Sequence, residues 1–189
     1  MPKLWTETIE AHRSSVADAI MDKTAALAAA EGLHTLTMAR IAQETGIGRA
    51  TLYKYFGAIE EILERWHQRE VTTHLETLLR IRAEVPDPLD ALQKVLLFYA
   101  ANSRKGHNHA LGALLHTMPH VRHAQSHLQH VVADLIAQAI KGKALKSEAS
   151  PSELARFALA AIAASEQAGT KPALERLVRM ILRGMGGRP

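Results

Sequence analysis

Several residue types and patterns are absent from this chain of 189 residues, and each absence excludes a class of protein. There is no cysteine, which excludes a disulfide framework, a thiolate zinc site and a cysteine nucleophile. No apolar run approaches the roughly 18 residues that a transmembrane helix needs, and the N-terminal segment lacks the apolar stretch of a secretory signal. We therefore expect a soluble, cytoplasmic protein without a membrane partner.

The chain also lacks strand patterns and common enzyme motifs. No segment alternates apolar and polar residues for long enough to predict a β-strand. The phosphate-binding P-loop, the nucleophile elbow and the HExxH zinc motif are missing. Gly46 and Gly48 begin a GxG pattern, but no third glycine completes it and no strand precedes it. These absences predict an all-α protein that is not an enzyme and needs no cofactor.

The charge of the chain supports nucleic-acid binding only locally. The formal net charge is +4 at pH 7, but residues 1–56 carry six Lys or Arg and six Asp or Glu, a net charge of zero. The segment from Thr45 to Ile59 contains Arg49 and Lys54 and no acidic residue. A prediction of nucleic-acid binding must therefore rest on a motif in this segment.

Residues 37–56, TMARIAQETGIGRATLYKYF, have the pattern of two short helices joined by a tight turn at residues 46–48. On a helix with about 100° per residue, Leu52 and Phe56 share the buried side of the second helix. The opposite side carries Ala50, Thr51 and Lys54, flanked by Arg49, Tyr53 and Tyr55. This pattern predicts a helix-turn-helix whose second helix enters the DNA major groove.

The first helix of the motif is also two-sided. Thr37 stands at the N-cap position, where its hydroxyl can accept a hydrogen bond from a free backbone N–H. The exposed residues are expected to be Arg40 and Gln43. The buried residues are expected to be Met38, Ile41, Ala42 and Thr45.

These residues closely resemble the TetR family of bacterial transcriptional regulators, over roughly residues 12–66. The matching positions are Ile20, residues 25–32, Ile41, Ala42, residues 45–47, residues 51–56 and residues 60–63. The resemblance implies an all-α homodimer that binds a palindromic operator in double-stranded DNA. It further implies a protein that usually represses and that a small-molecule effector releases from DNA.

The resemblance also implies roles for the exposed residues of the motif. Arg49, Ala50 and Thr51 would lie nearest the base edges. The residues that would contact phosphates or hold the register are Thr37, Arg40, Tyr53, Lys54 and Tyr55. Gln43, on the exposed side, and Gly48, at the cap of the recognition helix, complete the candidate DNA-binding set.

Two positions depart from the family pattern. Gly48 stands where serine is common, so the recognition helix has a backbone-only cap, at a cost on the order of a few tenths of a kcal/mol. Ile59 stands where lysine is common. The missing phosphate contact is expected to lower operator affinity and to reduce the salt dependence by about one unit of slope.

Proline and glycine breaks divide the whole chain into helices. The expected helices are residues 8–31, 38–45, 49–55, 58–84, 88–105, 108–118, 120–141, 151–167 and 171–185. The first three form a DNA-binding domain, residues 1–57, and the others form a helical effector-binding and dimerisation domain, residues 58–189. The long helix 58–84 connects the two, either as a mobile link that can shift the recognition helix or as a rigid strut.

The last two helices are expected to form the dimer interface. Small residues surround Leu159 and Ile162, and apolar residues recur at helical spacing in the final helix. Two such helices per subunit would build a four-helix bundle across a two-fold axis. Packing of the same stripes into the chain's own core is the alternative.

An organic effector is expected to bind inside the C-terminal helices. The candidate pocket residues are Trp66, His74, Phe98, Tyr99, Asn102, Leu111, Leu115, His116 and Met118. Apolar and aromatic side chains at helical spacing are also what an ordinary core contains. A DNA-binding protein without an effector is therefore an alternative, although the size of the C-terminal domain favours sensing.

Seven of the eleven histidines lie within residues 107–130. Four of them share a lateral or outward side of helix 120–141 with the acid Asp134: His120, His123, His127 and His130. This spacing could hold zinc or nickel in a metal-responsive regulator. The alternative to a metal site is a solvated polar face without metal. We prefer this alternative because histidine pairs bind metal only where further ligands converge.

Overall fold

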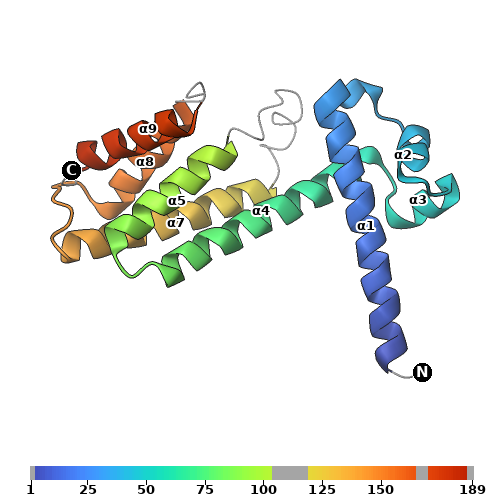
Figure 1. The fold of residues 1–189 in the computed structure, drawn as a ribbon, viewed down its shortest axis with the longest axis horizontal. Coiled ribbons are helices and arrows are strands. Elements are labelled where there is room, and N and C mark those ends of the chain that lie inside the picture. The colour runs from blue at the N-terminus through green and yellow to red at the C-terminus, as the bar shows by residue number, and fades with distance from the viewer. Residues whose placement is uncertain (1–2, 104–118, 165–169, 187–189) are drawn as a thin grey trace. The chain divides into compact units, whose positions relative to one another are not determined.

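The computed structural model describes residues 3–103, 119–164 and 170–186. In these ranges the chain forms eight α-helices and one 3-10 turn, and it contains no β-strand (Figure 1). The prediction of an all-α fold, with an N-terminal helix-turn-helix followed by a helical domain, is confirmed. No helix among the described residues has the length and apolar character needed to cross a membrane.

The chain divides into two compact units, and the described residues change from the first to the second between Glu70 and Val71. The elements that begin in the first unit are α1 (Lys3–Glu31), η1 (Leu33–Thr35), α2 (Met38–Thr45), α3 (Arg49–Tyr55) and α4 (Ile59–Glu84). Its core joins Ile20, Ile41, Leu52 and Phe56 to Ile62, which is the fourth residue of α4. Because α4 supplies part of this core, the unit continues past the boundary after residue 57 that the sequence suggests.

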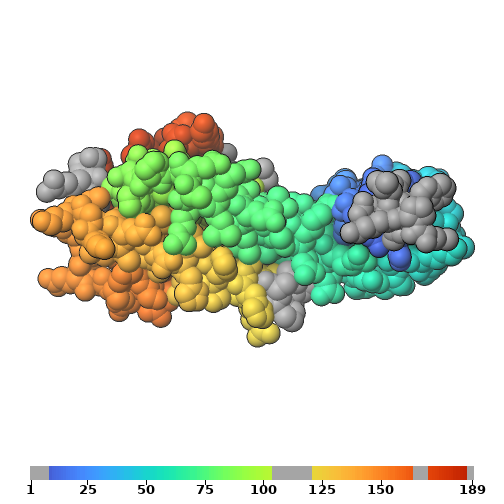
Figure 2. Space-filling model, turned by 90° about the horizontal axis from the view of Figure 1, so that it is seen from below, coloured from blue at the N-terminus to red at the C-terminus, as the bar shows by residue number. Residues whose placement is uncertain are grey.

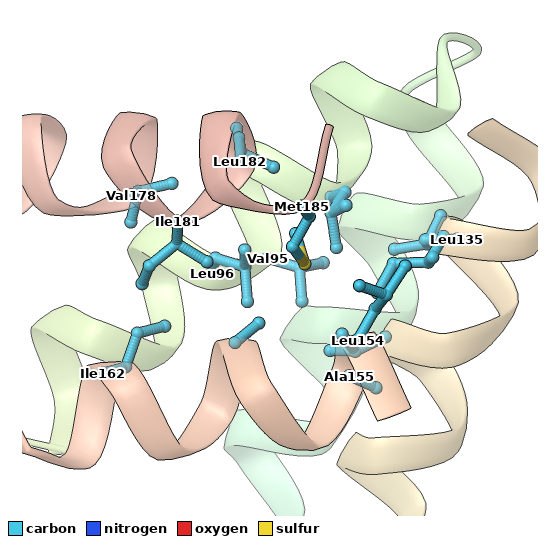
Figure 3. Close-up of a cluster of buried hydrophobic side chains, with 14 of the residues drawn as sticks. Val95, Leu96, Leu135, Leu154, Ala155, Ile162, Val178, Ile181, Leu182 and Met185 are labelled. Atoms are coloured by element: carbon cyan, nitrogen blue, oxygen red, sulfur yellow. The ribbon is translucent and has the colours of Figure 1, made fainter. Parts of the chain in front are cut away.

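The second unit contains the end of α4 and four further helices. These are α5 (Pro88–Ser103), α7 (Pro119–Lys141), α8 (Pro151–Ala164) and α9 (Lys171–Gly184). All of them contribute to one apolar core, where Leu96, Leu135, Ile162 and Ile181 are among the buried side chains (Figure 3). Helices α5 and α7 pack against each other, and in Figure 2 the second unit runs from green through yellow and orange to red.

The apolar stripes of α8 and α9 pack into this core. The buried residues of the two stripes are Leu154, Ala155, Ala158, Ile162, Leu174, Val178, Ile181 and Leu182. For these residues the structure therefore shows the alternative, in which the apolar stripes pack into the core of their own subunit. A dimer interface on the same helices must use their other sides.

Local capping signals explain where the helices begin. The Asp87 carboxylate accepts a hydrogen bond from the N–H of Asp90 at 2.8 Å, and Pro88 follows as the first residue of α5. Ser150 and Glu153 form a capping box at α8, with the Ser150 N–H donating to Glu153 Oε2 at 2.8 Å. The hydroxyl and N–H of Ser150 hold the pKa of the Glu153 carboxyl below its usual value. Side chains one to three residues apart are enough to set these boundaries.

Other boundaries differ from the sequence-based prediction. Helix α1 begins at Lys3 and not at residue 8, and η1 was not predicted. Pro119, predicted as a break, is the first residue of α7, where its missing N–H costs nothing. The predicted helix 108–118 and the predicted helix ends at residues 105 and 167 lie outside the described residues.

Candidate DNA-binding surface

The entry to α2 is capped as the sequence predicts. Thr37 has an extended backbone, and its Oγ1 accepts a hydrogen bond from the N–H of Arg40 at 3.1 Å. Ile41 and Ala42 are buried, Met38 packs against the same core, and Gln43 is exposed. The hydroxyl of Thr45 is partly buried and donates to the carbonyl of Ile41 at 2.6 Å. The helix thus presents one apolar side to the core.

A left-handed glycine makes the turn between α2 and α3. Gly46 has φ 71° and ψ 17°, a conformation that glycine adopts without the penalty that a Cβ carries. Its N–H donates to the carbonyl of Gln43 at 3.2 Å, and the N–H of Ile47 donates to that of Ala42 at 3.1 Å. Two carbonyls at the end of α2 are therefore satisfied, and the chain can turn directly into α3.

The recognition helix α3 is buried on one side only. Leu52 is 0% exposed and Phe56, which follows the helix, is 1% exposed, whereas Tyr53 between them is 51% exposed. The other exposed residues of α3 are Arg49, Ala50, Thr51 and Lys54. Tyr55 is half-buried against the core. One side of α3 thus anchors the helix while the other presents polar and basic groups to solvent.

The two departures from the family pattern have distinct structural settings. Gly48 is the N-cap of α3 and makes no side-chain cap hydrogen bond; its carbonyl accepts from the N–H of Leu52 at 3.0 Å. Ile59 is partly buried and packs against the core that holds Phe56. An apolar side chain at position 59 therefore adds core contact in place of a surface charge.

Several cations of the first unit are held by acids from another helix. Arg40 of α2, predicted to be exposed, is half-buried and its Nη2 lies 2.5 Å from Glu31 Oε1. Lys23 pairs with Glu44 at 3.0 Å. A phosphate that approached Arg40 would have to share this guanidinium with a carboxylate.

An ion-pair cluster joins the first half of α4 to α1. Arg69 donates to Asp18 at 2.7 Å and also to Asp22, one turn further along α1. Partial burial lowers the pKa of the Arg69 guanidinium, but the hydrogen bonds and charges of the two aspartates outweigh it and raise the pKa above its usual value. The cluster fixes this part of α4 against α1, which packs in turn on α2.

The candidate effector residues fall in different surroundings. Trp66 packs against the core of the first unit. In the second unit the rings of His74 and Phe98 meet edge to face with centroids 5.7 Å apart, and Asn102 donates to the carbonyl of Phe98 at 2.8 Å. Phe98 and Tyr99 pack partly buried against the large core. The remaining candidates, outside the described residues, are Leu111, Leu115, His116 and Met118.

The histidine-rich side of α7 is exposed, as its spacing predicts. The described histidines on it are His123, His127 and His130. Asp134 at the end of the row forms an ion pair with Arg82 at 3.2 Å, and the side chain of His120 lies outside the described part. Among the side chains that the structure describes, no three His, Asp or Glu gather as metal ligands.

Arg13 and Arg65 were not predicted to lie near the recognition helix. The guanidinium carbon of Arg13 lies 5.9 Å from the centre of the Tyr55 ring, and that of Arg65 lies 5.0 Å from the centre of the Phe56 ring. Both distances fall within the cation–π range. The two arginines lie 42 and 9 residues from their aromatic partners, so helical periodicity could not have found the first of them.

Comparisons with known proteins agree with this geometry. Residues 20–65 match the family model described as bacterial regulatory proteins, tetR family. An uncharacterized HTH-type transcriptional regulator of Haemophilus influenzae is 33% identical over 66 residues, which span 35% of this chain and 35% of that protein. The sequence likeness to this relative therefore covers only about a third of its length.

The likeness to solved structures extends over nearly the whole chain. A TetR-family transcriptional regulator from Agrobacterium tumefaciens has a TM-score of 0.70 at 17% identity, covering 93% of this chain and all of the other (100%). The regulator FadR from Bacillus subtilis, solved in complex with stearoyl-CoA, has a TM-score of 0.67 at 16% identity, covering 89% and 96%. At these identities the likeness shows the fold. Residues 20–65 thus match the helix-turn-helix segment of the tetR family of bacterial regulatory proteins, and the fold of nearly the whole chain is similar to that of solved TetR-family regulators.

Proposed function

We propose that the protein is a homodimeric DNA-binding repressor that binds a palindromic operator through α3 and releases it when a small molecule binds the second unit. The observation that carries the proposal is the two-sided recognition helix. Leu52 and Phe56 anchor it in the core, while Arg49, Thr51 and Lys54 are exposed. A rigidly anchored helix with an exposed polar face is what insertion into a major groove requires.

Within this surface some exposed residues would contact the bases and others the DNA backbone. Arg49, Ala50 and Thr51 in the first turn of α3 would lie nearest the base edges. Tyr53, Lys54 and Tyr55, with Thr37 and Gln43 of the preceding helix, would contact phosphates or hold the register. Arg40 would contribute less, because Glu31 already neutralises its charge.

Selection of bound duplexes from a random DNA library near physiological salt tests the proposal. A dimeric repressor would enrich a palindrome with half-sites about one turn, 34–36 Å, apart. Arg49→Ala should change or abolish the enrichment, whereas Arg80→Ala, which removes the same charge from an exposed position of the second unit, should not. Binding without enrichment that fades steeply with salt would instead indicate a non-specific DNA-binding protein.

The dimer would form through the outer sides of α8 and α9. Phe157 on α8 is 50% exposed and Met180 on α9 is 69% exposed, although both helices bury a full apolar stripe inside the subunit. Sedimentation equilibrium should give a dimer that Phe157→Glu or Met180→Glu dissociates. Leu79→Glu, at a comparably exposed apolar position on α4, is the control and should leave the dimer intact.

The effector would be an organic molecule with an apolar part. His74, Phe98, Tyr99 and Asn102 supply aromatic and polar groups, and Phe98 and Tyr99 pack partly buried against the second unit's core. Because FadR was solved with stearoyl-CoA, acyl-CoA thioesters are the first class to test, by thermal shift and then by release of the selected duplex. Zinc and nickel belong in the same screen, and a wholly silent screen would favour a regulator without an effector.

A further inference from the structure

The basic side chains of the first unit fall into two groups, according to whether an acid neutralises them. Among its described residues, Lys23, Arg40, Arg65 and Arg69 each have a carboxylate within 4.0 Å. In the same part of the chain no ion pair is found for Arg13, Arg49 or Lys54. Two of these three cations belong to the recognition helix, and the third is on α1.

Arg13 nevertheless lies at the recognition helix. Its guanidinium stands over the ring of Tyr55, the last residue of α3, at 5.9 Å from the ring centre. The N-terminal part of α1 projects beyond the helix-turn-helix (Figure 1), and residues 9–15 of α1 are exposed. The tertiary packing of α1 thus adds a third unpaired cation beside Lys54 and Tyr55.

Stacking on an aromatic ring suits an arginine for phosphate binding. The ring contacts one face of the planar guanidinium, so the N–H groups along its edges remain available to hold two oxygens of a phosphate. The stack also restricts a long, exposed side chain, which reduces the entropy that would be lost on binding. No carboxylate among the described residues competes for these N–H groups, in contrast to Arg40.

We propose that Arg13 is a phosphate-binding residue of the DNA-binding surface, supplied by α1 from outside the helix-turn-helix. The inference rests on the proposed function, because it requires α3 to lie in a major groove and bring the DNA backbone to Tyr55. It goes beyond the motif, since Arg13 precedes the segment that matches the family model, residues 20–65. The alternative is that the stack only holds α1 against α3.

The test compares Arg13→Ala with a matched control, Arg65→Ala. Both arginines are exposed and stack on an aromatic residue at the end of α3, but Arg65 is paired with Glu61 at 4.0 Å. Affinity is measured by fluorescence anisotropy over a salt series. The probes are the duplex enriched by the wild-type protein and a mixed-sequence duplex of the same length.

Arg13→Ala should make the plot of log K against log[salt] shallower by about 0.9 for each subunit bound, and the affinities should converge with wild type near 1 M salt. Near 0.1 M salt the loss should be roughly 5- to 10-fold per contact, and equal on both duplexes because phosphates carry no sequence information. Arg13→Lys should restore most of the slope. Arg65→Ala should keep the wild-type slope.

Two results would overturn the proposal, and they differ from each other. If Arg13→Ala melts at a lower temperature but keeps the wild-type slope on both duplexes, the stack is structural and Arg13 does not bind phosphate. If the wild-type protein binds neither duplex, the DNA-binding function itself is wrong, and the role of Arg13 is lost with it.

Discussion

The two units of this molecule use their polar residues in opposite ways. In the first unit, acids of α1, α2 and α4 pair with four of the described cations, and the three described cations that remain unpaired lie on or beside the recognition helix. In the second unit, α5, α7, α8 and α9 bury one continuous apolar core, and polar side chains cap the starts of α5, α8 and α9. The proposed DNA-binding surface therefore differs from the rest of the first unit in its unpaired cations, whereas a site for an apolar ligand would resemble the core around it.

The largest expected effect is a loss of stability in the first unit alone. Leu52→Ala removes a fully buried side chain from the core that anchors α3 and should destabilise the first unit by about 2–5 kcal/mol. Hydrogen exchange should show α2 and α3 losing protection while α5 and α7 keep theirs. Thr51→Ala, one residue away and exposed, should leave exchange unchanged. Equal loss of protection in both units would mean that they unfold as one.

A backbone position should have a comparable effect in the second unit. Gly186 has φ 88°, and a Cβ at this position would lie 1.8 Å from the carbonyl oxygen of Lys146. Gly186→Ala should therefore destabilise the second unit by about 2–4 kcal/mol, through backbone strain and displacement of the loop before α8. Thermal unfolding measures the change. Gly184→Ala is the control, since its Cβ would meet Phe157 at an ordinary 3.8 Å; similar melting temperatures for the two variants would contradict the geometry.

Substitutions on α3 should distinguish residues that recognise bases from residues that bind the DNA backbone. Arg49→Ala or Thr51→Ala should reduce discrimination between operator variants by about 1–3 kcal/mol at the affected base pair. Lys54→Ala should weaken all duplexes alike and make the salt dependence shallower by about one unit. Competition binding against single-base operator variants measures both effects. An unchanged preference in Arg49→Ala would show that the assignment of roles within α3 is wrong.

The smallest expected effect concerns the cap of the recognition helix. A Cβ at Gly48 would meet only Thr51 Oγ1, at 3.8 Å, so a larger side chain fits. Gly48→Ser supplies the missing cap hydrogen bond and should stabilise the first unit by about a few tenths of a kcal/mol. Gly48→Ala adds the same Cβ without the hydroxyl and should destabilise it instead. Chemical denaturation, with hydrogen exchange at α3 as the readout, measures the stability of both variants. Equal effects of Gly48→Ser and Gly48→Ala would contradict a capping role.

The parts of the first unit that could be predicted depend on neighbouring residues. The cap by Thr37, the turn at Gly46 and the burial of Leu52 each follow from contacts within about one helical turn, where side-chain direction is set by helix geometry. The same reasoning correctly predicted the exposed histidine side of α7. Effector binding and dimerisation involve groups from several elements and stay predictions, and metal binding by the histidine row stays the less favoured alternative.

The features that escaped prediction join residues far apart in the chain. Periodicity shows that Arg13 and Arg40 can be exposed, but not that Tyr55 lies under the first and Glu31 beside the second. It also left open whether the stripes of α8 and α9 face a partner or their own core. That question is decided by where α5 and α7 lie, because an apolar stripe is the same in either environment.

The sequence by itself determined the all-α class, the helix-turn-helix and the identity of the side chains that α3 presents, because caps, glycine turns and helical periodicity act over a few residues. Only the tertiary structure decided which cations remain free, which apolar stripes are already used, and which part of α4 belongs to the first core. Ion pairing and burial depend on distances between helices that adjacent residues do not specify. The charge available to DNA is therefore a property of the packed domain, although the motif that positions it is local.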